Sequence, residues 1–454
     1  MLDEAMKVGH KVIKEAKKKG MDEIELFITY HNQKQVIING LSIGTQRARS
    51  EIGAGIRVIH KGAEGFSYTN IMTLESLNKA AAEAFSVAKL SPKIEGLSLP
   101  TKKPVEKING TYSEDIADLE ADALTKDALD FIAGYTSIDD RIKTVLSSIT
   151  ANVSQTAILN SNGVELERKA ANYQGGLLCI ASDKDKAGGY VFDNLFSRKH
   201  DLDLKTAGEK LGKRALDGFK QETISAFKGS IIFKAQAMSN PVAIVSSLAA
   251  SGDWRQRGIS FWKDKLADKV ADEKFQLVDK PHNLGGGDGV KPFDDEGSPT
   301  NELKIVKDGV LQTFMHNVRT ANKENLESTG NATRAFGPPP NFSQKPTNIL
   351  PNSPWILAGD MSEEEMIQET KKGIIIHNYQ GTVRYQNGIF SGVAKGAQLI
   401  ENGEIVKPVT GISISGNVFE LINNISGIGK EYHLAGGWLT TPFMRFENIK
   451  ISTK

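Results

Sequence analysis

The chain has 454 residues, of which 39% are hydrophobic and 24% are charged, a composition typical of a folded globular protein and unlike a disordered or fibrous one. Its 56 basic and 55 acidic residues give a net charge of +1, so the overall charge indicates neither a nucleic-acid partner nor an anionic membrane. A single cysteine cannot form an intramolecular disulfide, and no apolar run approaches the ~18 residues of a membrane span. We therefore expect a cytoplasmic protein without a signal peptide or a membrane partner.

Helical periodicity at both ends of the first hundred residues predicts an N-terminal α/β domain over residues 1–100. Apolar residues on one helical face predict a helix over residues 2–19, and an alanine-rich segment predicts a second over residues 74–90. Between them apolar and polar residues alternate, which indicates an antiparallel strand meander. We expect its strands at residues 23–30, 33–38, 43–49, 54–60 and 65–68, with turns at Asn39-Gly40, Gly53 and Gly62.

A proline- and lysine-containing segment over residues 91–115 predicts a linker, and a weaker boundary is expected near residues 218–229. Between them we expect a middle α+β domain over residues 101–225. Its predicted elements are a helix over residues 119–135 capped by Asp118, strands over 142–160 and 164–192, and a helix over 202–216 capped by Asp201.

Residues 226–454 are expected to form a C-terminal β-rich domain. Three dipeptides between alternating apolar runs are strong hairpin signals: Asp308-Gly309, Asn387-Gly388 and Asn402-Gly403. Two helices are expected to interrupt the strands. One begins at a capping box of Ser362 and Glu365, and the other covers residues 419–428 after Asn417. The predicted fold class is therefore α+β.

The histidines and the cysteine form no recognisable catalytic motif. No two of the eight histidines lie within one helical turn, and none has a neighbouring glutamate, whereas a zinc peptidase usually needs two histidines a turn apart beside a glutamate. A site assembled from distant histidines is an alternative. Cys179 lies between Leu178 and Ile180 and is expected to be a buried small hydrophobe rather than a nucleophile.

Two loops contain residues that a binding site could use. Residues 285–289 are glycine-rich but lack the lysine and hydroxyl of a phosphate cradle, so we expect a flexible turn. Asp294, Asp295 and Glu296 precede Gly297 and form the densest carboxylate cluster. Adjacent carboxylates in a loop are expected to be solvated or to cap a turn, with a divalent metal site as the alternative.

Three further segments point to a known family when their order and spacing are taken together. Residues 292–299 read Pro-Phe-Asp-Asp-Glu-Gly-Ser-Pro, residues 397–409 contain Ala-Gln-Leu-Ile-Glu-Asn-Gly followed by Lys-Pro-Val, and residues 441–448 read Thr-Pro-Phe-Met-Arg-Phe-Glu-Asn. These segments resemble the TldD/PmbA family, whose members are also called modulators of DNA gyrase. The resemblance extends weakly over the whole chain.

The resemblance implies two kinds of subunit in a peptidase complex. Catalytic chains of TldD type carry a His-Glu-x-x-x-His zinc helix just before a Gly-Asp-aromatic-x-x-Arg-Gly element, and a cysteine near the C-terminus helps to bind the metal. That element is present here as residues 252–258. Counting back from it, the two histidines and the glutamate fall at Ala243, Leu248 and Ile244, and no cysteine follows Cys179.

Alanine, isoleucine and leucine side chains offer no lone pair to a metal. We therefore expect no catalytic residue, metal or cofactor in this chain, and residues 241–250 are expected to form a packed core helix. The resemblance implies a non-catalytic subunit of a heteromeric zinc metallopeptidase acting on peptides or unfolded segments. Its expected partners are a TldD-type catalytic subunit that holds the zinc and a peptide substrate, with a homodimer in isolation.

Two other functions stay open from the sequence. One is a homo-oligomeric peptide- or protein-binding module with no peptidase role. The other is a hydrolase with an unrecognised site, for example at residues 294–296 with a distant histidine.

The segment after the vestigial zinc helix is the predicted subunit contact. Aromatic and arginine side chains dominate interface hot spots, and they are typical of packed protein contacts more than of stacking on a nucleic-acid base. The candidate contact residues are Trp254, Arg255, Arg257, Phe261 and Trp262. The alternative is that the aromatic residues belong to the core and the arginines are solvated.

Overall fold

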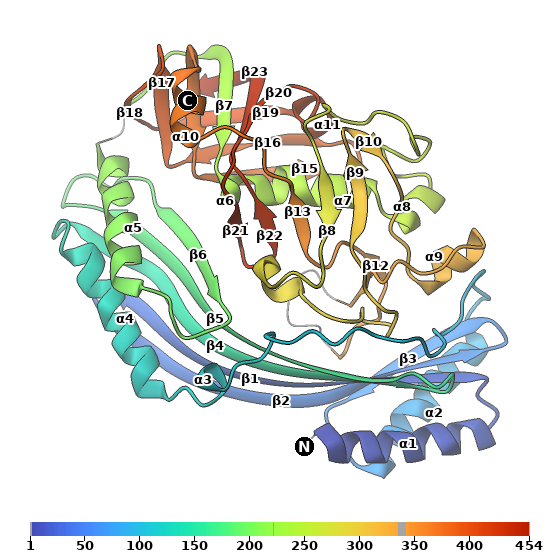
Figure 1. Cartoon of the computed structure of the whole chain (residues 1–454). Helices are drawn as coiled ribbons and strands as arrows, with labels where there is room; N and C mark the ends of the chain where they lie inside the picture. The colour runs from blue at the N-terminus through green and yellow to red at the C-terminus, as the bar shows by residue number, and fades with distance from the viewer. Residues whose placement is uncertain (1, 221, 335–341, 454) are drawn as a thin grey trace.

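A long curved sheet forms one side of the molecule, and the C-terminal half packs over its inner face (Figure 1). The structure is a computed structural model and describes residues 2–220, 222–334 and 342–453. Six antiparallel strands follow the order β3-β2-β1-β4-β5-β6. Their bounds are β1 (Glu23–Gly40), β2 (Ser42–His60), β3 (Ala63–Thr69), β4 (Ile142–Asn160), β5 (Glu165–Ala181) and β6 (Val191–Ser197).

The helices of the first half of the chain lie on the outer face of this sheet (Figure 1). Along β1, Leu26 and Ile28 pack against α1 and α2, whereas Glu25 and Phe27 point to the opposite, inner face. A second cluster joins the far half of the sheet to α4 and α5. The helices are α1 (Leu2–Lys18), α2 (Leu74–Leu90), α3 (Glu114–Ala117), α4 (Ala121–Thr136) and α5 (Leu204–Phe219).

Because β1 pairs with β4, the predicted N-terminal and middle domains contribute strands to one sheet. The domain boundaries expected at residues 100 and 225 stay predictions. In the part of the chain that the structure describes, no helix is long and apolar enough to cross a membrane.

The C-terminal half contains two larger sheets and a two-stranded one. A nine-stranded sheet follows the order β15-β16-β19-β23-β7-β14-β17-β18, with β20 also paired to β23. Its strands are β7 (Phe227–Phe233), β14 (Lys372–Ile376), β15 (Asn378–Arg384), β16 (Ile389–Lys395), β17 (Ala397–Glu401), β18 (Glu404–Val409), β19 (Ile412–Asn417), β20 (Ile425–Ile428) and β23 (Met444–Thr453).

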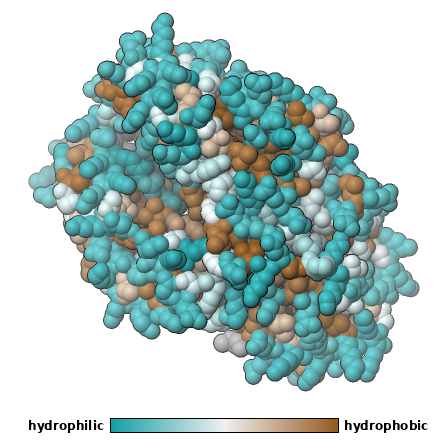
Figure 2. All heavy atoms as spheres, viewed as in Figure 1, coloured by the Kyte–Doolittle hydropathy of each residue, from teal (hydrophilic) through white to brown (hydrophobic). Residues whose placement is uncertain are grey.

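The second sheet follows the order β10-β9-β8-β13-β22-β21. Its strands are β8 (Leu277–Asp279), β9 (Leu303–Lys307), β10 (Val310–Leu311), β13 (Pro354–Ile356), β21 (His433–Ala435) and β22 (Leu439–Thr441), while β11 (Ala332–Thr333) pairs with β12 (Asn348–Ile349). One extended apolar cluster runs between the two larger sheets. On the face drawn in Figure 2, hydrophobic side chains lie in patches among hydrophilic ones. The α+β fold class is thus confirmed, with a β-rich C-terminal half.

The expected breaks inside the first strands are wrong. β1 continues through residues 31 and 32, and β2 continues through Gly53. A Cβ atom at Gly53 would lie 2.4 Å from the Phe342 ring, so this glycine permits a close approach rather than a turn. Gly62, with φ of +79°, does form the predicted turn.

Other predicted elements agree with the structure more closely. The three Asx-Gly dipeptides connect β9 to β10, β15 to β16 and β17 to β18, and Ser362 caps α10 (Glu363–Gln368) in a capping box with Glu365. Asp203, two residues after the expected Asp201, caps α5, and α4 starts after Glu120 rather than Asp118. The helix expected over residues 419–428 ends early as α11 (Val418–Leu421), because residues 425–428 pair with β23.

Candidate functional site

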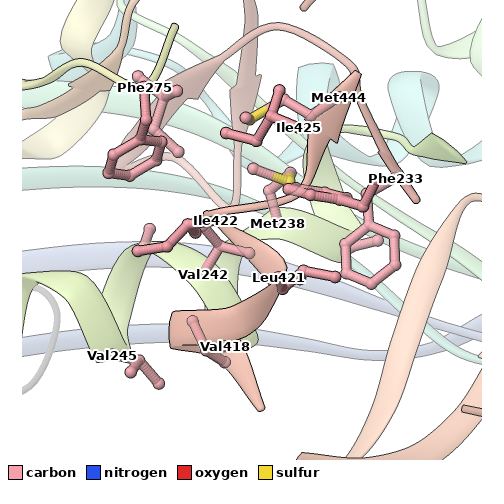
Figure 3. Packing of buried hydrophobic residues seen from close by; sticks show 14 of the residues in the cluster. Phe233, Met238, Val242, Val245, Phe275, Val418, Leu421, Ile422, Ile425 and Met444 are labelled. Atoms are coloured by element: carbon pink, nitrogen blue, oxygen red, sulfur yellow. The ribbon is translucent and has the colours of Figure 1, made fainter. Parts of the chain in front are cut away.

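The segment predicted to be a vestigial zinc helix lies in the apolar core of the C-terminal half. It consists of α6 (Ala235–Met238), a π-helical turn η1 (Ser239–Ile244) and α7 (Val245–Ala249). Met238, Val242 and Val245 pack into the cluster that contains Phe233 and Ile422 (Figure 3). The prediction of a packed helix is therefore confirmed, with a π turn that the sequence pattern did not indicate.

The three vestigial positions differ in their surroundings. Ala243 is fully buried, Ile244 is partly buried, and Leu248 is 6% exposed and borders a cleft. Methyl and branched alkyl groups cannot ligate zinc or activate water, so these residues do not fit the metal that the family resemblance implies. Within residues 2–220, 222–334 and 342–453, no group of three or more His, Cys, Asp or Glu side chains is arranged to hold a metal ion.

The cleft beside Leu248 separates the curved sheet from the C-terminal half and has a volume of about 380 Å³. Arg57 and Glu64, from β2 and β3, line one wall. Trp254 from α8 (Gly252–Gln256) and Arg319 from α9 (Val318–Lys323) line the other. The cleft therefore brings a vestigial zinc-helix position together with part of the predicted contact segment.

The predicted contact residues occupy three different environments. Trp262 is 1% exposed and belongs to the core, while Arg255 pairs with Glu324 at 2.5 Å. Phe261 is 53% exposed and stacks on Phe419 with ring centroids 4.0 Å apart. Trp254 is half-buried and Arg257 is exposed. Trp254, Arg257 and Phe261 are thus accessible to a partner, while Trp262 packs edge-on against Phe419, on which Phe261 stacks.

The carboxylate loop at residues 294–297 is buried, so the expectation of a solvated loop is wrong. The expectation that a carboxylate caps a turn is confirmed, because the N–H groups of Glu296 and Ser298 donate to Asp294 Oδ1. Asp294, Asp295 and Glu296 are at most 2% exposed. The loop lies against the inner face of the curved sheet, where Phe293 packs with Phe27.

Cations from both halves of the chain neutralise this loop. Arg57 contacts Glu25 and Glu296, each with an N–O distance of 2.9 Å. Arg168 of β5 pairs with Asp295 at 2.9 Å, and Arg334, which is also buried, pairs with Glu25. Together these side chains form an ion-paired interface between the curved sheet and the C-terminal half.

The loop carboxylates titrate differently because their neighbours differ. Burial and the adjacent Glu296 carboxylate raise the pKa of Asp294 to about 7. Three backbone N–H groups donate hydrogen bonds to Asp294 and act in the opposite direction, but they do not outweigh these two effects. Burial also acts to raise the pKa of Asp295, but Lys291 and Arg168 hold it well below its usual range. Asp295 and Glu296 pair with protein cations and Asp294 accepts from backbone N–H groups, so the alternative of a divalent metal site is not supported.

The glycine-rich loop makes a second contact with the curved sheet. It forms the short helical turn η2 (Leu284–Gly289), and a Cβ at Gly289 would lie 1.7 Å from the Asn352 carbonyl oxygen, so the segment is closely packed rather than a flexible turn. Asn172 and Gln174 of β5 donate hydrogen bonds to Asp288 at 2.5 and 3.0 Å. Burial raises the pKa of Asp288 to about 6.

The sequence interpretation missed Glu25, Arg57 and Arg334. The sequence does contain a signal for Glu25 and Arg57. Each is a charged residue between two apolar residues of a predicted strand, Glu25 between Ile24 and Leu26 and Arg57 between Ile56 and Val58. No local pattern indicates Arg334. Cys179 is buried as expected, and burial raises the pKa of its thiol to about 12.

Comparison with known families accounts for all three parts of the chain. Residues 227–453 match the family model of the PmbA/TldA metallopeptidase C-terminal domain, residues 103–219 match the central domain, and residues 27–88 match domain 1. This chain belongs to the TldD/PmbA metallopeptidase family. A TldD/PmbA relative described as a metalloprotease of Methanocaldococcus jannaschii is 26% identical over 403 residues and covers 85% of each chain.

Two further comparisons agree with this membership. A metalloprotease PmbA homolog of Buchnera aphidicola is 32% identical over 276 residues, which are 60% of this chain and 57% of that protein. The crystal structure of TldE from Thermococcus kodakarensis superposes with a TM-score of 0.88 at 23% identity and covers 98% of this chain and 100% of that one. The structural similarity shows that the TldE fold is shared.

Proposed function

We propose that this chain is a non-catalytic subunit of a heteromeric TldD/PmbA-type zinc metallopeptidase that acts on peptides or unfolded segments. The observation that carries the proposal is the replacement of the family's zinc ligands and glutamate by Ala243, Leu248 and Ile244. Their helix is filled by apolar packing, so the fold of the family is kept while the chemistry of the helix is lost.

A TldD-type subunit is the proposed partner, and it would supply the zinc and the general base. This chain would contribute one wall of the peptide-binding space through the cleft at Leu248 and Trp254. The half-buried Trp254 and the exposed Arg257 and Phe261 are the proposed contact side chains. In isolation the same face would favour a homodimer.

The alternative of a hydrolase at residues 294–296 has less support. Asp294 and Asp295 are buried, and Glu296, which lines the cleft, is held in an ion pair with Arg57. A homo-oligomeric peptide- or protein-binding module is the remaining alternative. Association with a zinc-bearing relative distinguishes it from the proposed function.

The test is to express this chain alone, a TldD-type chain from the same genome alone, and both together. We expect the two chains to copurify, and we expect cleavage of a quenched fluorescent unstructured peptide to require the TldD-type chain and to increase when this chain is present. As a matched control, replacing the motif glutamate of the TldD-type chain with glutamine abolishes cleavage by the complex. Stoichiometric zinc retained by this chain alone after dialysis, or cleavage by it alone, would overturn the proposal.

A further inference from the structure

The first half of β2 has an unpaired edge. β3 pairs with residues 54–60 of β2, and β1 pairs with β2 along the other side from residue 42 to residue 59. In the part of the chain that the structure describes, no strand pairs with the outer edge of Ser42–Ile52, which we call the open edge. Eleven residues of extended strand span ~36 Å, so the segment offers a long row of main-chain donors and acceptors.

The middle of the open edge is exposed and carries two arginines. Residues 44–50 are all exposed. Gln46 donates a hydrogen bond to Thr125 of α4, so the even-numbered residues from Gln46 to Ile52 face the outer helices. Arg47 and Arg49 therefore project on the inner face, the same side as Arg57. Arg49 pairs with Glu51 at 2.6 Å, whereas Arg47 makes no ion pair with any residue that the structure describes.

An apolar tip continues the open edge at the end of the sheet. Gly40 of β1 pairs with Thr144 of β4, and three large apolar side chains flank this pair. Leu41, Val145 and Leu146 are 58%, 56% and 62% exposed. Exposed apolar residues gathered beside an unpaired strand mark an interaction surface more often than isolated ones do.

The charge on the open edge argues against a second copy of this chain as its occupant. If two copies paired antiparallel over the whole of Ser42–Ile52, the pairing would be centred on residue 47. Arg47 of one copy would then lie opposite Arg47 of the other. Like charges directly opposite each other destabilise a strand pair. A strand with carboxylates at alternating positions would instead neutralise Arg47 and Arg49, and cross-strand opposite charges stabilise the pair.

We propose that the open edge and the apolar tip dock an acidic strand of the TldD-type catalytic subunit, which pairs with β2 and extends the curved sheet. This inference rests on the proposed function. It adds a second contact to the one formed by Trp254, Arg257 and Phe261. The edge lies beside α4 and the other surface beside α8, on different sides of the molecule (Figure 1). A partner with the same fold, related by a pseudo-two-fold axis, can occupy both, because each subunit then offers both patches to the other.

The first test compares charge reversals of equal size. Arg47→Glu with Arg49→Glu places negative charge on the open edge, and Lys7→Glu with Lys11→Glu makes the same change in net charge on exposed positions of α1. We expect the edge variant to bind the TldD-type chain at least about tenfold more weakly, and the α1 variant to bind like the wild type. Melting temperatures of the isolated variants check that both are folded. Equal affinity of the two variants would overturn the inference.

The second test follows the main-chain amides directly. Strand pairing adds hydrogen bonds to alternate N–H groups of Ser42–Ile52, so their hydrogen exchange should slow when the wild-type complex forms. Unchanged exchange in this segment within a complex that assembles and cleaves peptide would overturn the inference but leave the proposed function standing. If the wild-type chains do not associate at all, both the inference and the proposed function are overturned.

Discussion

The helix of α6, η1 and α7 is surrounded by apolar side chains such as Phe233 and Ile422, whereas the loop at residues 294–297 is surrounded by guanidinium and ammonium groups. Both segments are almost fully buried. Burial of the helix is favourable because it removes apolar surface from water, but burial of the loop carboxylates is tolerated only because each meets a cation or several N–H donors. A polar side chain introduced into the helix should therefore lower the stability of the protein. At the loop, stability should fall when an ion-pair partner is removed.

The largest effect is expected from a charge placed in the apolar region. Ala243→Asp puts an unpaired carboxylate among apolar side chains and should lower the free energy of unfolding by ~4 kcal/mol or more, or prevent folding. Leu248→Asp is the matched comparison, since Leu248 borders the cleft and its carboxylate can reach water. Urea denaturation measures both. An Ala243→Asp variant as stable as the wild type would contradict the packing described for this helix.

A somewhat smaller effect is expected from removing one partner in the ionic region. Arg57→Ala leaves Glu25 and Glu296 with less compensation and should cost ~3–5 kcal/mol. Arg49→Ala, on the exposed part of the same strand, should cost less than ~1 kcal/mol. If Arg57→Ala is no more destabilising than Arg49→Ala in chemical denaturation, the buried network does not hold the two halves together.

The glycine-rich turn η2, the second buried polar contact with the curved sheet, should also make stability depend on pH. The raised pKa of Asp288, about 6, means that the folded chain binds this proton more tightly than the unfolded chain. The stability linked to Asp288 is therefore complete below its unfolded pKa of ~4 and is lost as pH rises through its folded pKa. Relative to Asp288→Asn, the wild type should lose free energy of unfolding between about pH 4 and pH 7. Asp264→Asn, the same substitution at an exposed position, is the matched control. A pH-independent difference for Asp288→Asn would rule out this role.

The smallest effect on stability is expected outside both regions. Arg257→Ala removes an exposed ion pair with Asp253 at 3.2 Å, which should change the free energy of unfolding by less than ~1 kcal/mol. The same change, and Trp254→Ala, should weaken association with a TldD-type chain and lower its peptidase activity. Wild-type yield in copurification together with full cleavage for both variants would exclude this segment as the contact.

Local sequence patterns predicted where helices and hairpins lie in this fold better than they predicted which residues are buried. Helical spacing placed α1 and α2 almost to the residue, and Asp308-Gly309 and Asn402-Gly403 located hairpins, because these signals depend on neighbours in the chain. The burial of residues 294–297 was not predictable in the same way. Its cause is Arg57 and Arg168, which lie more than a hundred residues earlier in sequence and meet the loop only after the sheet and the C-terminal half are packed together.

The place of β23 in the nine-stranded sheet has a consequence for biosynthesis. This strand, formed by residues 444–453, lies between β19 and β7, and β7 begins more than two hundred residues earlier at Phe227. While the ribosome is still making the intervening segments, Ile231 and Phe233 have no neighbour on that side of β7. Strand pairing between segments so far apart in sequence is slow, and until it occurs it leaves an aggregation-prone strand edge exposed. The nascent chain should therefore depend on chaperones until β23 has left the ribosome, and deletion of residues 444–453 should yield aggregates rather than a folded, shortened chain.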